Sequence, residues 1–125
     1  MKEIIATNDG PKAIGPYSQA IKANGFLFLS GQIAIDPVTN TLVSGDVSFQ
    51  TDRVLKNLAG ILKAAGSGLE KVVRSTVFLQ NMTDFNGMNE VYSRYFSSEP
   101  PARSTVEVAR LPKDVLVEID VIALA

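Results

Sequence analysis

Residues 48–79 read SFQTDRVLKNLAGILKAAGSGLEKVVRSTVFL, and this stretch decides the fold class. Its first part, Ser48 to Ala65, places apolar side chains three or four residues apart, which is the spacing of one helical face. That face comprises Val54, Leu55, Leu58, Ile61, Leu62 and Ala65. Asp46 or Ser48 can cap the start of this helix, and Gly66 stands where a left-handed C-terminal cap belongs. The β-branched run from Val72 to Leu79 predicts a strand that follows the helix.

A second helix follows this strand. Asp84 can cap its start, and Pro100-Pro101 stops it. Its apolar face comprises Phe85, Met88, Tyr92, Tyr95 and Phe96. Two strand–helix units that share one sheet predict a two-layer α+β domain, a mixed sheet with both helices on one face. The length of 125 residues fits a single domain over 1–125.

The N-terminal region predicts strands and tight turns. Ile4 to Ala6 forms a short strand, and the runs 19–23 and 26–33 flank Asn24-Gly25. Asn-Gly between two apolar runs is a strong hairpin signal, because both residues tolerate positive φ. Residues 36–40, rich in turn formers, predict a loop.

The last third of the chain predicts a hairpin between residues 103–110 and 115–124. With Lys113-Asp114 as the central turn residues, Pro112 faces Val115 and the apolar side chains fall on one face that meets the helices. That face comprises Ser104, Val106, Val108, Val117, Ile119, Val121 and Ala123. The other face carries Arg103, Thr105, Glu107, Ala109, Glu118, Asp120, Ile122 and Leu124. This polar face is either solvated or meets another subunit and lines a polar site, and its two large aliphatic residues favour an oligomer.

Composition excludes several classes of protein. The chain is 46% hydrophobic and 20% charged, no apolar run approaches the ~20 residues of a membrane span, and no secretory signal is present. We therefore expect a cytoplasmic protein without a membrane partner. The formal net charge of −1 argues against a nucleic-acid partner, because phosphate binding favours a basic surface.

The sequence contains no cysteine and no histidine. This excludes thiolate nucleophiles, Ser-His triads and the usual zinc sites. There is also no calcium-loop pattern, and we expect no metal and no cofactor. Catalysis must then use Arg, Lys, Tyr, Ser, Thr, Asp, Glu, backbone groups and water.

Arg103 is the first candidate for such chemistry. It follows Pro100-Pro101 at the start of a predicted strand, and its planar guanidinium suits bidentate binding of a carboxylate. The alternative is an ion pair with Glu107 or Glu118. Glu118 shares the proposed polar face, where its carboxylate could deprotonate or orient a water, or simply pair with a basic side chain.

Three other segments offer weaker candidates. Ser30-Gly31 closes an apolar run, and a glycine inside a strand marks either a bulge or the close approach of backbone or a ligand. Tyr17 sits in a tight turn after Gly15-Pro16, which either presents its hydroxyl or merely shapes a loop. Asn89 lies on the second helix, where it could equally be solvated.

Several of these segments together resemble the Rid, or YjgF-like, family, and the match is similar to its RidA branch. The segments are IGPYS (14–18), FLSGQ (28–32), AAG (64–66), PARSTVEVARLPKD (101–114) and VEID (117–120). The resemblance covers nearly the whole chain. It departs from the family pattern at Thr105, where members often have cysteine, and at Pro100, where many have an aromatic residue.

The resemblance implies a chorismate-mutase-like α+β fold, a homotrimer with sites in clefts between subunits, and no cofactor. It implies 2-iminobutanoate/2-iminopropanoate deaminase activity, the hydrolysis of reactive enamine or imine acids such as 2-aminoacrylate to 2-oxo acids and ammonia. By resemblance, Arg103 binds the substrate carboxylate and Glu118 positions or activates the attacking water. The other residues implied to contact the ligand are Tyr17, Ser30, Gly31, Asn89 and the backbone of Thr105.

Two other functions remain open at this point. A non-catalytic protein could bind or sense 2-oxo acids in the same cleft. A chaperone-like or translation-inhibiting role has been attached to some relatives, and the acidic balance of this chain gives it little support.

Overall fold

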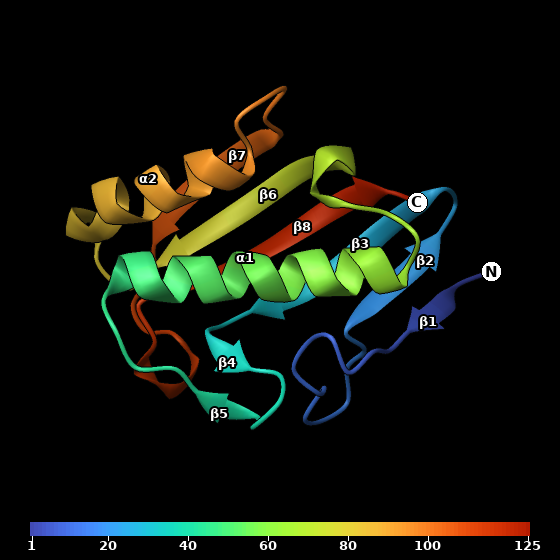
Figure 1. Ribbon diagram of the computed structural model, residues 1–125, viewed down its shortest axis with the longest axis horizontal. Helices are drawn as coiled ribbons and strands as arrows, with labels where there is room; N and C mark the ends of the chain where they lie inside the picture. Colours follow the sequence, from blue (N-terminus) through green and yellow to red (C-terminus); the bar gives the residue numbers. More distant parts are fainter.

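Two helices cover one face of a six-stranded mixed sheet in the computed structural model, which describes residues 1–125 (Figure 1). The strand order is β1-β2-β3-β8-β6-β7, and β4 and β5 form a separate small hairpin. The strands are β1 (Glu3–Ile5), β2 (Ala20–Ala23), β3 (Phe26–Gln32), β4 (Ile35–Asp36), β5 (Thr41–Leu42), β6 (Val72–Leu79), β7 (Ala102–Glu107) and β8 (Val117–Leu124). The helices are α1 (Val47–Ala64) and α2 (Phe85–Tyr95), with 3-10 turns η1 (Leu69–Lys71), η2 (Met82–Asp84) and η3 (Pro112–Asp114). The predicted two-layer α+β class is confirmed.

The caps predicted for α1 are present. The Asp46 side chain accepts a 2.9 Å hydrogen bond from the backbone N–H of Phe49, which satisfies a donor that the first helical turn leaves free. Gly66 adopts φ +80° just after the helix, a left-handed conformation that favours glycine. The predicted Asn24-Gly25 hairpin is also confirmed, with both φ values positive and Ala23 paired with Phe26.

The start of α2 differs from the prediction in its cap. Asp84 occupies the N-cap position but makes no capping bond. The side chain of Asn81 caps the preceding turn η2 instead, by accepting a bond from the backbone N–H of Thr83. The predicted loop over residues 36–40 is the turn of the β4–β5 hairpin, where the Asp36 side chain accepts a 2.8 Å bond from the N–H of Val38.

The predicted hairpin between residues 103–110 and 115–124 is wrong. Strand β7 pairs with β6 in parallel, and β8 pairs antiparallel with β3 on one side and with β6 on the other. Lys113 and Asp114 do take positive φ values of 55° and 56°, but the loop that they occupy crosses the end of β6 rather than joining adjacent strands. A turn at Lys113-Asp114 is therefore present as predicted, but the strands before and after it, β7 and β8, do not pair with each other.

This pairing also reverses the two faces of β7. Register sets Ser75 of β6 opposite Arg103 and Val77 opposite Thr105, and both β6 residues are fully buried beneath the helices. Arg103 and Thr105 consequently face the helices, while Ser104 and Val106 face away, opposite to the prediction. The faces predicted for β8 are confirmed, because Val117, Ile119, Val121 and Ala123 are all buried.

The core lies between the helices and the sheet. The predicted stripe of α1 supplies Val54, Leu55, Leu58, Ile61 and Leu62, each with no exposed area. Burying one such side chain contributes about 1.5–3 kcal/mol, so this stripe fixes α1 on the sheet. No helix has the length and apolar content that crossing a membrane requires.

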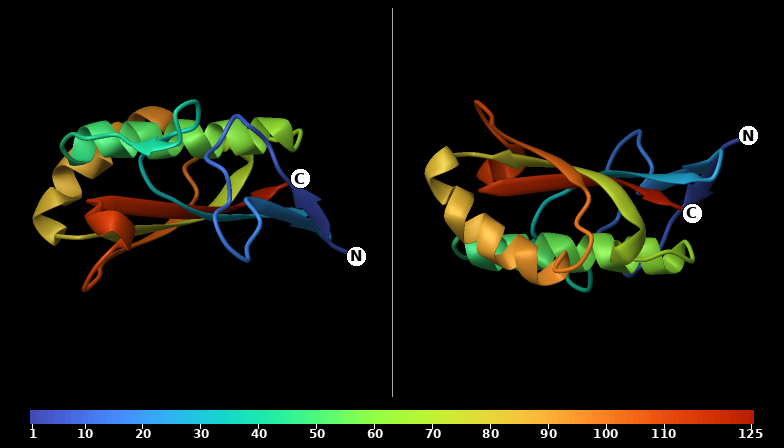
Figure 2. Two further views of the ribbon diagram at one scale, coloured as in Figure 1. Left: turned by 90° about the horizontal axis from the view of Figure 1, so that it is seen from below. Right: turned by 90° about the horizontal axis from the view of Figure 1, so that it is seen from above.

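The opposite face of the sheet carries no second layer (Figure 2). Its side chains include Phe26 and Phe28, which are 37% and 44% exposed with ring centroids 6.4 Å apart, and the neighbouring Leu124, which is 45% exposed. We call this the bare face. Apolar side chains gathered on an uncovered sheet are typical of a surface that meets another protein chain.

Candidate functional site

Arg103 lies at the start of the edge strand β7, just after Pro100-Pro101, with its side chain directed toward α2. It donates a 2.7 Å hydrogen bond to the side-chain oxygen of Asn89. Its guanidinium carbon lies 4.7 Å from the ring centroid of Tyr92 and 5.5 Å from that of Phe85. Asn89 and Arg103, both predicted site residues, are thus brought into direct contact.

The ion pair considered for Arg103 is not formed with either predicted partner. The salt bridges of the chain are Lys56–Asp52, Arg94–Glu90 and Arg110–Asp114. The Glu107 carboxylate accepts a bond from the backbone N–H of Met82 instead, and Glu118 lies on the other face of the sheet. The guanidinium of Arg103 is therefore held in place while its charge is not neutralised by a carboxylate of the same chain.

Tyr92 and Phe85 belong to this arrangement although sequence reasoning assigned them to the core. Phe85 precedes Asn89 by four residues on α2 and Tyr92 follows it by three, and these spacings place all three side chains on one helical face. An asparagine between two aromatic residues at this spacing is a signal that could have identified the surroundings of the arginine. Tyr92 is 4% exposed, and its hydroxyl shares a 2.6 Å hydrogen bond with the hydroxyl of the fully buried Ser75.

A cavity of about 390 Å³ opens beside Arg103. Its lining comprises Asn89, Tyr92, Ser93, Phe96, Pro100, Pro101 and Arg103. Thr105 lies two residues further along β7 on the same face, and its buried hydroxyl oxygen has no hydrogen-bond partner. A buried polar group without a partner is rare in folded proteins, and here it lies next to the candidate binding arginine.

Glu118 lies on the bare face of β8, against the backbone of Gly31. Strand β3 bulges between Leu29 and Gln32, which brings Gly31 under the carboxylate. A Cβ atom at Gly31 would lie 3.0 Å from Cδ and 3.2 Å from Cγ of Glu118, and closer still to Oε2. Glycine is needed here because any side chain would displace the carboxylate. The bulge considered for Gly31 is confirmed, and the group that approaches this glycine closely is the side chain of Glu118.

The electrostatic surroundings of Glu118 favour its protonated form. Partial burial, and secondarily the charge of Asp120, raise the pKa of the Glu118 carboxyl. Burial also raises the pKa of Asp120, against the lowering effects of a hydrogen bond from Thr76 and the charge of Arg74. A carboxyl with a raised pKa is a stronger base than an ordinary glutamate and so is better suited to accept a proton from water. No group of three or more acidic side chains comes together in the way a metal ion would need.

Tyr17 lies in the N-terminal loop, residues 6–19 between β1 and β2, and Ser30 lies in β3 beside that loop. The Ser30 hydroxyl donates a 2.6 Å bond to the backbone carbonyl of Ser18, and this ties the loop to β3 next to Tyr17. The Tyr17 ring is half exposed, and its hydroxyl accepts a 3.2 Å bond from the N–H of Ile14. The buried amide of Gln19 anchors the same loop through bonds to Thr7, Gly10 and Pro11.

The predicted residues therefore fall into two groups. Arg103 and Thr105 lie on the helix-covered face of the sheet, Glu118 and Gly31 lie on the bare face, and the loop that carries Tyr17 is tied to β3 through Ser30. We call Asn89, Arg103 and Thr105 the arginine half-site, and Tyr17, Ser30, Gly31 and Glu118 the glutamate half-site. Strand β6 separates β7 from β8, so Arg103 and Glu118 lie two strands apart as well as on opposite faces. The prediction that they share one face of a single chain is wrong, because it depended on the hairpin that does not form.

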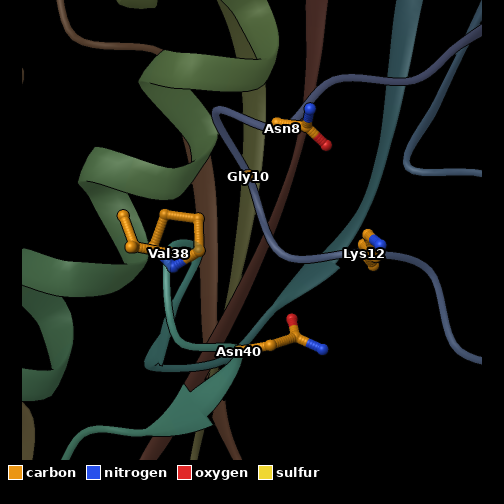
Figure 3. Close-up of a pocket in the computed structure, with 6 residues that line it drawn as sticks. Asn8, Gly10, Lys12, Val38 and Asn40 are labelled. Carbon is orange, nitrogen blue, oxygen red and sulfur yellow. The ribbon is translucent and has the colours of Figure 1, made fainter.

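A second cavity, also of about 390 Å³, is lined by none of the half-site residues. It opens between the N-terminal loop and the β4–β5 turn (Figure 3). Its lining comprises Asn8, Gly10, Lys12, Pro37, Val38 and Asn40. The lining contains no carboxylate and none of the predicted site residues, so we place the candidate chemistry at Arg103 and Glu118.

Two relatives show how similar this chain is to known proteins. It is 58% identical over 123 residues to a RutC family protein of Pyrococcus horikoshii, covering 98% of each chain. It is 48% identical over 122 residues to the chloroplastic Reactive Intermediate Deaminase A of Arabidopsis thaliana, covering 98% of this chain and 65% of that protein.

Solved structures agree with the sequence relatives. A Rid family protein from Yersinia pestis superposes with a TM-score of 0.97 at 49% identity, over all of both chains. The TdcF protein of E. coli, solved with bound serine, superposes with a TM-score of 0.93 at 41% identity, over 98% of each chain. The sequence model described as Endoribonuclease L-PSP matches residues 7–125. The chain therefore belongs to the Rid, or YjgF-like, family that this model describes.

Proposed function

We propose that this protein is a deaminase that hydrolyses 2-iminobutanoate, 2-iminopropanoate and their enamine forms, such as 2-aminoacrylate, to 2-oxo acids and ammonia. The observation that carries the proposal is the Arg103 guanidinium, which Asn89 and two aromatic rings hold in place without a neutralising carboxylate. Such a cation is ready to bind the carboxylate that every 2-imino acid carries. Family membership and the deaminase name of the Arabidopsis relative support the same reaction.

The reaction needs little beyond positioning. The carbon of a protonated imine is already electrophilic, so fixing the acid and a water in attack geometry supplies much of the acceleration. In our proposal, Glu118 accepts a proton from the water as its oxygen bonds to the imine carbon. Glu118 then gives this proton to the nitrogen of the addition product. The hydroxyl proton of that product passes to Glu118 as the C–N bond breaks, the carbonyl forms, and ammonia leaves. Tyr17, Ser30, Gly31 and the backbone of Thr105 line the cleft.

A single chain cannot assemble this site, because Arg103 and Glu118 lie on opposite faces of the sheet. We propose that the bare faces of three copies pack together as a homotrimer, so that the glutamate half-site of one subunit meets the arginine half-site of the next. The exposed Phe26, Phe28 and Leu124 give these faces the apolar area that such packing needs. This arrangement also accounts for a partly buried carboxylate without a basic partner in its own chain.

A coupled assay tests the activity. A threonine or serine dehydratase generates the imine, and the appearance of 2-oxobutanoate or pyruvate is followed with and without this protein. We expect the protein to accelerate the final step without added metal or cofactor. An unchanged rate at saturating protein would contradict the proposal.

A non-catalytic 2-oxo acid sensor is the second candidate, because the arginine half-site is complete within one chain and could bind a carboxylate without Glu118. Such a protein would bind 2-oxobutanoate or pyruvate saturably and leave imine decay unchanged. The same assay, combined with a binding titration, separates the two candidates.

A further inference from the structure

The side chain of Arg103 leaves an edge strand and is partly buried, so something must restrict its rotation if it is to meet a substrate in one orientation. Its polar contact within the chain is the single bond to Asn89, and its broad contacts are with two aromatic rings. A carboxylate partner would hold the guanidinium equally well but would compete with the substrate. An aromatic ring holds it by cation–π attraction and leaves all the charge available for binding.

We propose that Tyr92 is the positioning residue for Arg103, with its ring as the surface on which the guanidinium rests and Ser75 as the anchor of that ring. The guanidinium carbon lies nearer to the Tyr92 centroid, at 4.7 Å, than to the Phe85 centroid, at 5.5 Å. Tyr92 is therefore the stronger of the two aromatic contacts. The part of this inference that concerns substrate binding rests on the proposed function.

The anchoring of Tyr92 closes a loop of contacts through three elements. Ser75 of β6 holds the Tyr92 hydroxyl, Tyr92 of α2 holds Arg103, and Arg103 of β7 is the register neighbour of Ser75 in the parallel pair. Phe96 packs against the same ring with centroids 4.6 Å apart. The Ser75 hydrogen bond fixes the hydroxyl end of the ring, and Phe96 packed against the ring restricts its rotation about the Cβ–Oη axis, so the ring stays beside the guanidinium.

The hydroxyl of Tyr92 remains protonated under ordinary conditions. Burial raises the pKa of Tyr92, and this outweighs the lowering effects of the Ser75 hydrogen bond and the Arg103 charge. The ring thus attracts the guanidinium through its electron-rich face rather than as a phenolate. The strength of that attraction depends on electron density in the ring, and this dependence can be measured.

Phenylalanine analogues with one, two, three and then five ring fluorines, introduced at position 92, provide the test. They preserve ring shape while withdrawing electron density in steps. The readout is the Kd of 2-oxobutanoate, measured by titration calorimetry on the full-length protein. We expect Tyr92→Phe, which loses the Ser75 bond but keeps the ring, to weaken binding by no more than a few-fold, and the fluorinated series to weaken it stepwise relative to Tyr92→Phe, by about 2- to 30-fold overall. Tyr95→Phe is the matched control, because the Tyr95 hydroxyl donates to Asp52 of α1 and not to Ser75, and the cation–π contacts of Arg103 are with Tyr92 and Phe85.

The NMR chemical shift of the Arg103 Nε–H proton gives a readout that needs no substrate. We expect it to be displaced upfield by the ring current in the unmodified protein and in Tyr92→Phe, and to lose that displacement in Tyr92→Leu, with Arg103→Lys assigning the signal. A flat Kd across the fluorinated series would overturn the proposal even if Tyr92→Leu does not fold. If the binding and resonance trends hold while imine hydrolysis is not accelerated, the proposed function fails and the role of Tyr92 stands. If imine hydrolysis is accelerated while the Kd does not change across the fluorinated series, the proposed function stands and the role of Tyr92 fails.

Discussion

The two faces of the sheet surround their ionisable side chains differently. On the face that the helices cover, Arg103 is held by Asn89 and Tyr92, and its half-site is complete within one chain. On the bare face, Glu118 is partly buried beside the like-charged Asp120, among apolar side chains that nothing covers. The first half-site presents a charge that no carboxylate of the chain neutralises, and the second has no basic partner within the chain. The difference teaches that folding alone completes one half-site, and that the proposed assembly would have to complete the other.

Removal of the guanidinium should have the largest effect. Arg103→Ala deletes the charge that binds the substrate carboxylate, and we expect kcat/KM for imine hydrolysis to fall about 100-fold or more. The coupled dehydratase assay measures the loss, and circular dichroism checks that the fold persists. Arg94→Ala is the control, because that arginine is exposed and paired with Glu90 on α2. Full activity in Arg103→Ala would exclude the carboxylate-binding role.

Mixed assemblies test whether the two half-sites meet between chains. Arg103→Ala and Glu118→Gln subunits should each be inactive alone. When the two are co-expressed and trimers containing both are purified through different tags, some interfaces combine an intact Arg103 with an intact Glu118. In a cyclic trimer that contains both variants, one of the three interfaces combines the two intact side chains, so we expect about a third of the unmodified activity.

The control pairs Arg103→Ala subunits with subunits that carry both substitutions. No interface in that mixture has both side chains, and no recovery is expected. If the first mixture also fails to recover while mass analysis shows mixed assemblies, the two side chains do not act across an interface, and the trimer proposal loses its mechanistic basis.

Adjacent residues of β3 sharpen the comparison between the faces. Leu27 is fully buried under the helices, and Phe28 is 44% exposed on the bare face. We expect Leu27→Ala to lower the free energy of unfolding by about 2–5 kcal/mol in urea titrations at matched protein concentration. Phe28→Ala should change it less but shift the assembly toward smaller species in light scattering. An unchanged mass for Phe28→Ala would argue that the bare face is not the contact surface.

The sequence was sufficient to predict the layers of the fold. The stripe from Val54 to Leu62, the Asp46 cap and the Asn24-Gly25 turn depend on neighbours close in the chain, and each is found as expected. The alternation on β8 was also predictable, because a strand between two neighbours buries one face whatever their order.

Strand order was not predictable from the same local signals. The run from Ala102 to Glu107 has no long apolar alternation, since β7 is an edge strand with one neighbour. A turn at Lys113-Asp114 suits a hairpin and a wider crossing equally well, so the apolar pattern could not show that β6 intervenes. That error placed Arg103 and Glu118 on one face. The resemblance nevertheless selected the same residues, because it depends on their identity and not on their pairing.

The smallest expected effect concerns the titration of Glu118. As a base, this carboxyl must be ionised, so kcat/KM should fall as the pH drops through its pKa. We call this fall the acidic limb of the pH–rate profile. Burial raises the pKa of Glu118, so the acidic limb should lie above the ordinary carboxyl value of 4.5. The negative charge of Asp120 contributes to the same shift. Asp120→Asn removes that charge, which lowers the pKa of Glu118, so activity should persist to lower pH. A pH–rate profile measures the displacement, and Glu118→Gln should abolish the limb together with the activity. A limb that moves to higher pH in Asp120→Asn would show that the base is a different group, because the loss of a neighbouring negative charge cannot raise the pKa of Glu118.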